Sequence, residues 1–127
     1  NAYAYQTSLL FMGVTYNPAT KSATGTLLSP ETYDSELKKV VPIFDEDYQA
    51  PVALGFDSFD DVTKNLHIFT KYRGVGDCGS LATYAVSPQA LTLLSFAEQS
   101  CEVADEFHLK NPEAQDMPAW PIVYRHQ

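Results

Sequence analysis

Three glycines lie within the seven residues 73–79, and this segment restricts the chain more than any other part of its sequence. Glycine adopts positive φ angles without strain and allows a second backbone to come close. The segment directly follows residues 66–72, where apolar and polar side chains alternate as they do along a half-buried strand. We therefore expect a tight bend that connects this strand to a second one.

The same segment contains the pattern G-x-G-x-x-G from Gly74 to Gly79, which is also found in dinucleotide-binding sites. Such a site needs a helix that opens at the third glycine and an acidic residue about 20 positions further on. Glu98 meets that spacing, but residues 81–86 are β-like and only 48 residues follow Gly79. We therefore favour a structural bend that holds Cys78 for a bridge, and we expect no cofactor.

Strand patterns dominate the chain. Apolar alternation bounded by turn residues predicts strands at residues 5–16, 23–28, 52–56, 66–72, 81–86, 91–96 and 120–125. Four residues separate the runs 81–86 and 91–96, and this spacing favours a hairpin. The same four residues also permit a helix that is capped by Ser87 and has Pro88 at its first position.

Two segments carry helix signals. In residues 30–40, Ser29 can cap a helix and Pro30 suits its first turn. One face of that helix would carry three apolar side chains, those of Tyr33, Leu37 and Val40. A shorter helix is predicted at residues 102–110, ending before Asn111 and Pro112.

Composition indicates one domain that spans residues 1–127. Apolar residues make up 45% of the chain, and 8 Tyr, 7 Phe and 1 Trp supply enough aromatic surface for a folded core. The two cysteines, Cys78 and Cys101, are compatible with one disulfide and equally with two buried reduced thiols. A bridge between them would close a loop of about 24 residues, worth roughly 3 kcal/mol in the chain-entropy model.

Acidic residues outnumber basic ones by 16 to 8, so the formal net charge is −8. Nucleic-acid binding depends on Lys and Arg that neutralise phosphates, and anionic membrane surfaces also attract basic clusters. We therefore expect neither nucleic acid nor a membrane surface as partner, and no apolar run is long enough for membrane insertion. A cationic protein or peptide is the partner that this charge would attract. The oligomeric state is not indicated.

Two acidic runs stand out, and they comprise Asp45, Glu46 and Asp47 in the first and Asp57, Asp60 and Asp61 in the second. Carboxylates close in sequence can bind calcium, but neither run fits the twelve-residue calcium loop. Solvated turn residues are the favoured interpretation. The three histidines are far apart in sequence and no C-x-x-C pair occurs, so we expect no metal site.

Arg73 and Asp77 flank the glycines of the bend. They can pair with each other as a structural clamp, or they can present a guanidinium to an anionic ligand. The clamp is the favoured interpretation. We accordingly regard Arg73, Gly74, Gly76, Asp77 and Gly79 as residues of a structural turn or of a binding site.

Residues 71–80 read Lys-Tyr-Arg-Gly-Val-Gly-Asp-Cys-Gly-Ser. They resemble the signature Lys-Gly-Arg-Gly-(Leu/Ile)-Gly-Asp-Cys-Gly of a bacterial exported family, the domain-of-unknown-function family 1176. The flanking segments are similar as well, and the matching positions are Phe56-Asp57, Asn65-Leu66, Phe69, Cys101, Trp120-Pro121, Arg125 and the segment 2–6. The resemblance therefore covers most of the chain.

The resemblance implies export to an oxidising compartment, as a periplasmic or secreted protein. It also implies a disulfide between Cys78 and Cys101 and a hairpin at residues 81–96. It implies no known activity. Members of the family usually have more cysteines, a further N-terminal region and Trp at the position of Tyr84. We therefore expect this chain to correspond to the C-terminal domain of a longer exported protein.

These observations predict a β-rich α+β domain, with a twisted antiparallel sheet, one or two short helices and one disulfide. The favoured function is a non-enzymatic binding module of the bacterial cell envelope that recognises a cationic protein or peptide through its two acidic runs. A lysozyme is one candidate partner. The alternatives are a small hydrolase that uses Asp77 and Arg73, and a structural domain that packs within a larger envelope protein. An extensive exposed apolar patch would favour the last of these.

Overall fold

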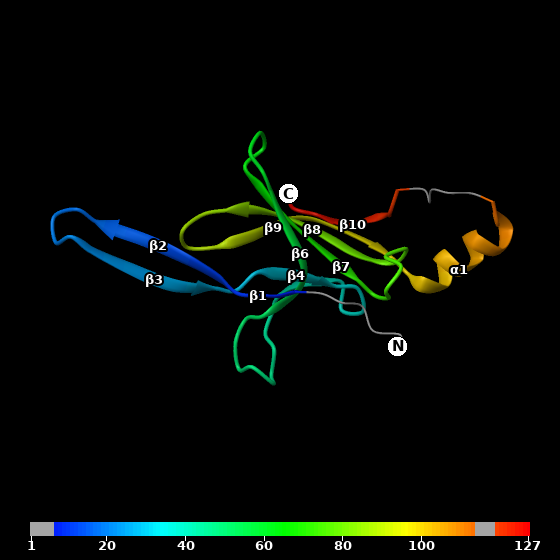
Figure 1. Cartoon of the computed structure of the whole chain (residues 1–127), viewed down its shortest axis with the longest axis horizontal. Coiled ribbons are helices and arrows are strands. Elements are labelled where there is room, and N and C mark those ends of the chain that lie inside the picture. Colours follow the sequence, from blue (N-terminus) through cyan, green and yellow to red (C-terminus); the bar gives the residue numbers. More distant parts are fainter. Residues whose placement is uncertain (1–6, 114–118) are drawn as a thin grey trace.

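The structure is a computed structural model, and it describes residues 7–113 and 119–127. It confirms the predicted β-rich fold with antiparallel sheets, one helix and one disulfide. The main sheet has six antiparallel strands (Figure 1), in the order β1 (Thr7–Leu9), β6 (Ala53–Asp60), β7 (Asn65–Lys71), β8 (Gly79–Val86), β9 (Leu91–Gln99) and β10 (Ile122–Arg125).

Two hairpins and a helix complete the fold. The strands β2 (Phe11–Asn17) and β3 (Ser22–Leu28) form a two-stranded ribbon that projects from one end of the molecule (Figure 1). The strands β4 (Glu31–Asp34) and β5 (Lys39–Pro42) form a second hairpin, whose Tyr33 and Val40 pack against the core. The helix α1 (Cys101–Lys110) follows β9 in the sequence and precedes β10, and it lies at the end of the molecule opposite the ribbon.

The core lies on one face of the main sheet, which we call the front face. Apolar residues of neighbouring strands stand directly opposite each other there, so that Leu66 of β7 pairs with Tyr84 of β8, and Tyr84 pairs with Leu93 of β9. Leu93 is fully buried and Tyr84 is 1% exposed. Cross-strand apolar pairs of this kind are the main stabilising unit of a sheet.

The strands β8 and β9 form the predicted hairpin, and the alternative helix at Ser87 does not form. The Ser87 hydroxyl instead accepts hydrogen bonds from the amides of Gln89 and Ala90 at the turn. The pairing shifts between Thr83 and Tyr84, which leaves a bulge in β9. A bulge interrupts the ladder of backbone hydrogen bonds, so other groups must satisfy its amides.

The residue Glu31 of β4 fills that need. Its carboxylate oxygen Oε1 accepts a hydrogen bond of 2.8 Å from the Leu93 amide, next to the bulge. The Tyr84 hydroxyl donates to the Glu31 carbonyl oxygen at 2.6 Å. Burial and the nearby Glu31 carboxylate raise the pKa of Tyr84, so the hydroxyl keeps its proton and remains a donor. These two bonds fix the β4–β5 hairpin over the front face.

The predicted helix at residues 30–40 is wrong, because this segment forms the β4–β5 hairpin. The Asp34 carboxylate accepts hydrogen bonds from the amides of Glu36 and Leu37, which stabilises a turn in the middle of the segment. Lys38 has a φ of 55°, which ends any helical path. In the hairpin, Tyr33 stacks on Tyr124 of the main sheet, with ring centroids 5.3 Å apart. This contact stabilises the hairpin more than a solvent-exposed position on a helix would stabilise the helix.

Other boundaries also differ from the predictions. The predicted strand at residues 5–16 is divided into β1 and β2, and residues 5 and 6 lie outside the described part. The strand β6 extends four residues beyond the predicted end at residue 56, so Asp57 lies on a strand. The predicted helix at residues 102–110 is present as α1, whose first turn is capped by the Ser100 hydroxyl. In the described part of the chain, no helix is long and apolar enough to cross a membrane.

The ribbon is anchored to the main sheet by a close backbone contact at Gly13. A Cβ atom at this position would lie 1.7 Å from the carbonyl oxygen of Pro88, in the β8–β9 turn. We expect Gly13→Ala to displace the two backbones and lower the free energy of unfolding by about 1–3 kcal/mol. Denaturant unfolding of both proteins measures the difference.

The matched control is Gly25→Ala on the other strand of the ribbon. A Cβ atom there would meet only the flexible end of the Met12 side chain, at 2.7 Å from its sulfur. This variant should stay within about 1 kcal/mol of the original chain. Equal stability of the Gly13 and Gly25 variants would contradict the anchoring role of Gly13.

Candidate functional site

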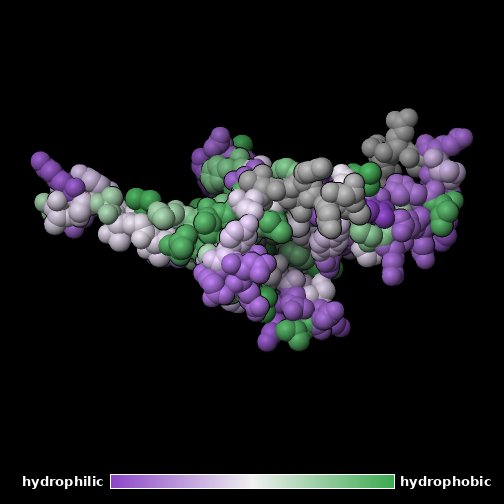
Figure 2. Space-filling model, turned by 60° about the horizontal axis from the view of Figure 1, so that its bottom comes forward, coloured by the Kyte–Doolittle hydropathy of each residue, from purple (hydrophilic) through white to green (hydrophobic). Residues whose placement is uncertain are grey.

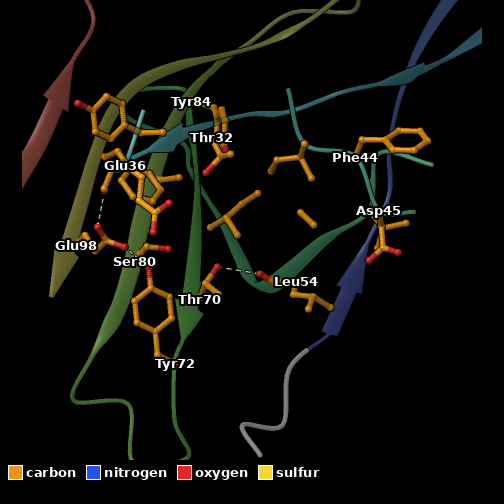
Figure 3. Close-up of a pocket in the computed structure, with 18 residues that line it drawn as sticks. Thr32, Glu36, Phe44, Asp45, Leu54, Thr70, Tyr72, Ser80, Tyr84 and Glu98 are labelled. Atoms are coloured by element: carbon orange, nitrogen blue, oxygen red, sulfur yellow. Dashed lines mark hydrogen bonds between the residues drawn. The ribbon is translucent and has the colours of Figure 1, made fainter. Parts of the chain in front are cut away.

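A groove of about 580 Å³ lies between the β4–β5 hairpin and the front face of the main sheet (Figure 3). We call it the sheet groove. Its floor comes from β7, β8 and β9, and its walls come from β4, from the turn after it and from the segments 43–45 and 52–54. Side chains that are far apart in the sequence meet here only because the hairpin folds over the sheet.

The floor of the sheet groove changes from apolar to polar along the strands. One cross-strand row consists of Ile68, Ala82 and Phe96. The row beside it consists of Thr70, Ser80 and Glu98. Residues two positions apart on a strand point to the same face, so the two rows are neighbours on the groove floor. The floor therefore offers an apolar surface next to a carboxylate.

Glu98 is the half-buried acid of this floor. Its Oε1 accepts a hydrogen bond of 2.7 Å from the Ser35 hydroxyl, and its Oε2 accepts one from the Tyr72 hydroxyl. Burial and the Glu98 carboxylate raise the pKa of Tyr72, so this phenol stays protonated at neutral pH and donates a hydrogen bond to the carboxylate. Both partners are neutral hydroxyls, and they orient the carboxylate without neutralising its charge.

Two further carboxylates line the sheet groove. Figure 3 shows Glu36 near the end that holds Glu98, and Asp45 at the opposite end beside Phe44. Among the described residues that line the groove, none is Lys, Arg or His. Three carboxylates in a shallow cavity whose described lining contains no base focus a negative potential on its contents. The arrangement suits a ligand that has both a cationic and an apolar part.

The structure separates the two acidic runs that the sequence singled out. Asp45 lines the sheet groove, and its carboxylate also accepts hydrogen bonds from the amides of Asp47 and Tyr48 in the following turn. Glu46 and Asp47 are exposed in that turn. Figure 1 shows that this turn and the β6–β7 turn, where Asp60 and Asp61 lie, point in opposite directions from the sheet.

Asp60 stabilises the β6–β7 turn itself. Its carboxylate accepts hydrogen bonds from the amides of Val62 and Thr63, and these bonds lower its pKa. Asp57 is exposed on β6, and Asp61 is exposed in the turn. In the described part of the chain, no group of three His, Cys, Asp or Glu side chains is placed to hold a metal ion.

The glycines of residues 73–79 have different structural tasks. Gly76 has a φ of 72°, and its amide donates to the Arg73 carbonyl oxygen to close a tight turn. Gly79 has a φ of 155°, and a Cβ atom there would lie 2.0 Å from the Thr70 carbonyl oxygen. The carbonyl oxygen of Gly74 accepts a hydrogen bond from Lys71 Nζ at 3.4 Å. The segment thus brings the chain from β7 directly into β8.

The disulfide between Cys78 and Cys101 is present, with Cα atoms 5.1 Å apart. Cys78 is fully buried at the end of the glycine turn, and Cys101 is the first residue of α1. The bond therefore ties the start of the helix to the start of β8. Ala104, one turn further along the helix, is also fully buried.

A cluster of charges adds to this attachment. The Arg73 guanidinium donates to both carboxylate oxygens of Asp77, at 2.8 and 2.7 Å, and to Asp105 of α1 at 2.9 Å. Nε2 of His108, also on α1, lies 3.0 Å from Asp77 Oδ2. The Arg73 guanidinium lowers the pKa of Asp77 to about 2, and His108 contributes to the shift.

The geometry of this cluster favours the clamp interpretation of Arg73 and Asp77. The side chain of Asp77 is only 12% exposed, and both of its oxygens are engaged by neighbouring side chains. The charge of Arg73 is balanced by two carboxylates. A guanidinium in this state has little affinity left for an anionic substrate.

Sequence reasoning did not identify the acids of the sheet groove other than Asp45. Glu98 was considered only because of its spacing from the G-x-G-x-x-G pattern. Glu36 lies within the segment that was predicted as a helix. One signal was available, because Glu98 stands two residues after the buried Phe96 and therefore shares its face of the strand. An acid on the buried face of a strand is unusual and indicates a paired or functional group.

Comparison of the chain with protein-family models, with curated proteins and with solved structures gave no match. The similarity to the exported family 1176 therefore stays a prediction that rests on the sequence motif. The segment 2–6, which contributed to that similarity, lies outside the described residues.

The low pKa of Asp77 predicts a pH-dependent contribution to stability. Its pKa is about 2 in the folded chain, below the ordinary value near 3.9, so the ionised form favours folding above about pH 4. This contribution is lost as the pH falls from about 4 to 2. Because Arg73 is partly exposed, we expect Asp77→Asn to lower the free energy of unfolding at pH 7 by on the order of 1 kcal/mol.

The measurement compares denaturant unfolding of the two proteins at several pH values. The difference should be constant from pH 5 to 7 and shrink towards pH 2. Asp61→Asn is the matched control, since it removes the same charge from an exposed turn position. A pH-independent difference, or an equal effect of Asp61→Asn, would show that the clamp does not act through this ionisation.

Proposed function

We propose that this chain is an exported, non-enzymatic binding module that holds a cationic side chain of a protein or peptide in the sheet groove. The observation that carries the proposal is the set of three carboxylates, Glu36, Asp45 and Glu98, in a groove whose described lining contains no base. Asp45 and Glu98 are half-buried, whereas Glu36 is exposed at the rim. A half-buried carboxylate attracts a cation more strongly than a solvated one, because less water screens the interaction.

The shape of the groove floor matches the side chain of Lys or Arg. Both residues have an aliphatic stem and a cationic head group, and they bind surfaces that are apolar along the stem and polar at the head. The row of Ile68, Ala82 and Phe96 suits the stem. Glu98, held in place by Tyr72 and Ser35, suits the head group.

The net charge of the chain supports the same partner class. A formal charge of −8 attracts basic proteins over long range and accelerates their encounter, while the groove selects among them. In this proposal the groove acids, including Asp45, recognise the partner. Asp57, Asp60 and Asp61 contribute only to the negative electrostatic potential around the protein. A basic lysozyme, bound in the manner of an inhibitor, is one concrete partner.

The disulfide supports an extracytoplasmic location. Disulfides persist in the periplasm and outside the cell, whereas the cytosol keeps thiols reduced. The bond between Cys78 and Cys101 fits such a compartment, and the sequence motif around Cys78 fits an exported family of bacteria. Both observations support the proposed location in the bacterial periplasm or outside the cell.

The test compares two double variants with equal net charge. Glu36→Gln/Glu98→Gln removes two charges inside the sheet groove, and Asp57→Asn/Asp61→Asn removes two charges outside it. Binding is measured by calorimetry with a short oligolysine peptide and with a basic lysozyme, at low and at moderate salt. We expect the groove variant to bind at least tenfold more weakly than the original chain.

The variant outside the groove should bind nearly as well as the original chain at moderate salt, where long-range charge effects are screened. Equal weakening by both double variants would mean that only net charge matters. Absence of binding to both probes at low salt would contradict the proposal.

A second candidate function is that of a structural domain, and a separate observation favours it. On the face of the sheet opposite the core, partly exposed apolar residues of five neighbouring strands stand in one cross-strand row, and they are Phe56, Phe69, Leu81, Ala97 and Ile122. Such a row suits a packing partner within a larger envelope protein. If neither cationic probe binds, this candidate becomes the better account.

A further inference from the structure

The β2–β3 ribbon exposes an apolar face that no other part of the described chain covers. The register pairs Met12 with Leu27, Val14 with Gly25 and Tyr16 with Ala23, so these residues share one face. The four large side chains on this face are 49–61% exposed, and they are Met12, Val14, Tyr16 and Leu27. Gly25 and Ala23 add little bulk opposite them, so the side chains of β2 stand clear of the ribbon.

The opposite face of the ribbon is polar beyond its base, where Phe11 pairs with Leu28. Gly13, Thr15 and Asn17 of β2 share it with residues 22, 24 and 26 of β3, which are Ser and Thr. Two-stranded ribbons are only marginally stable in water, and they gain stability when an apolar face is buried. Figure 2 shows the ribbon extending clear of the body, with hydrophilic residues gathered at its outer end.

Charge distinguishes the ribbon from the rest of the chain. Residues 11–28 contain a single charged side chain, that of Lys21, so the ribbon carries +1 and the remaining residues carry −9 of the total of −8. Two copies of this acidic chain repel each other over most of their surfaces. The ribbon is the region where two copies can meet without bringing carboxylates together.

An apolar groove of about 410 Å³ adjoins the base of the ribbon. Met12 and Val14 of the exposed face line it, and so do residues 11, 13 and 28 of the opposite face. The main sheet contributes Phe59 of β6 and Val86 of β8, which are 50% and 48% exposed. The four large side chains of the exposed face, together with Phe59 and Val86, make six in each copy. If each of them offers on the order of 100 Å² of accessible surface, two copies bury about 1,200 Å² in total. That is the lower limit for a specific protein interface.

We propose that this face is the interface of a homodimer, in which the ribbons of two copies pack face to face about a two-fold axis. In an antiparallel arrangement, the outer part of each ribbon lies over the base of the other, so that Tyr16 of one copy approaches the apolar groove of its partner. The same patch then serves both copies, as in other two-fold interfaces. This inference is independent of the sheet groove and of its ligand.

The test measures the mass of the oxidised chain in solution by sedimentation equilibrium, over a roughly thousandfold range of concentration. We expect a dimer that dissociates on dilution. Val14→Lys places a charge in the centre of the apolar face and should weaken association about a hundredfold or more. Tyr16→Ser removes aromatic surface without adding charge and should also weaken it.

Thr24→Lys is the matched control, because it adds the same charge to the same ribbon on its polar, exposed face. It should change association by less than about threefold, and circular dichroism should show all variants folded. A chain that remains monomeric at every concentration overturns the proposal. Binding of a monomeric chain to neutral lipid vesicles through the ribbon would also overturn it. Equal effects of Val14→Lys and Thr24→Lys, or no effect of either, overturn it as well.

Discussion

The arrangement of the molecule depends on the contacts between Glu31 and the bulge of the β8–β9 hairpin. A single sheet with one apolar face is not a stable domain until something covers that face. The β4–β5 hairpin provides the cover, and Glu31 locks it in place through the Leu93 amide and the Tyr84 hydroxyl. Together with the stacking of Tyr33 on Tyr124, this lock holds the hairpin in place as the outer wall of the sheet groove.

The glycine turn and the sheet groove divide structure and recognition between them. The glycine turn joins β7 to β8, and the disulfide and the Arg73–Asp77 pair attach α1 to it. Each charged group of this cluster has a partner of opposite charge within it. The charges of the sheet groove are not balanced by any base of its described lining, and this difference is why we assign recognition to the groove.

Local patterns predicted the parts of the fold that local forces determine. The alternation in residues 66–72 was sufficient for β7, and the signals before Asn111 were sufficient for α1, whereas the local signals at Ser87 permitted a helix as well as the β8–β9 hairpin. The segment 30–40 was predicted as a helix because capping and helical spacing are local signals, whereas Tyr33 and Glu31 are fixed by partners more than 50 residues away.

The candidate site was harder to predict for the same reason. The sequence pointed to runs of neighbouring acids, and the structure separates those runs and places Glu36 and Asp45 in one groove with Glu98, which follows more than 50 residues later. No pattern within a short window reports such a combination. The glycine turn, by contrast, was recognisable because its residues are contiguous and because glycine has a steric reason to be there.

The most direct test of the account is an NMR titration of the ¹⁵N-labelled, oxidised chain with a short oligolysine peptide. If the sheet groove holds the cationic side chain, amide shifts should concentrate at Thr70, Ser80 and Glu98, and should persist at moderate salt. Shifts confined to the β6–β7 turn around Asp60, or scattered over all acidic positions and abolished by salt, would contradict it.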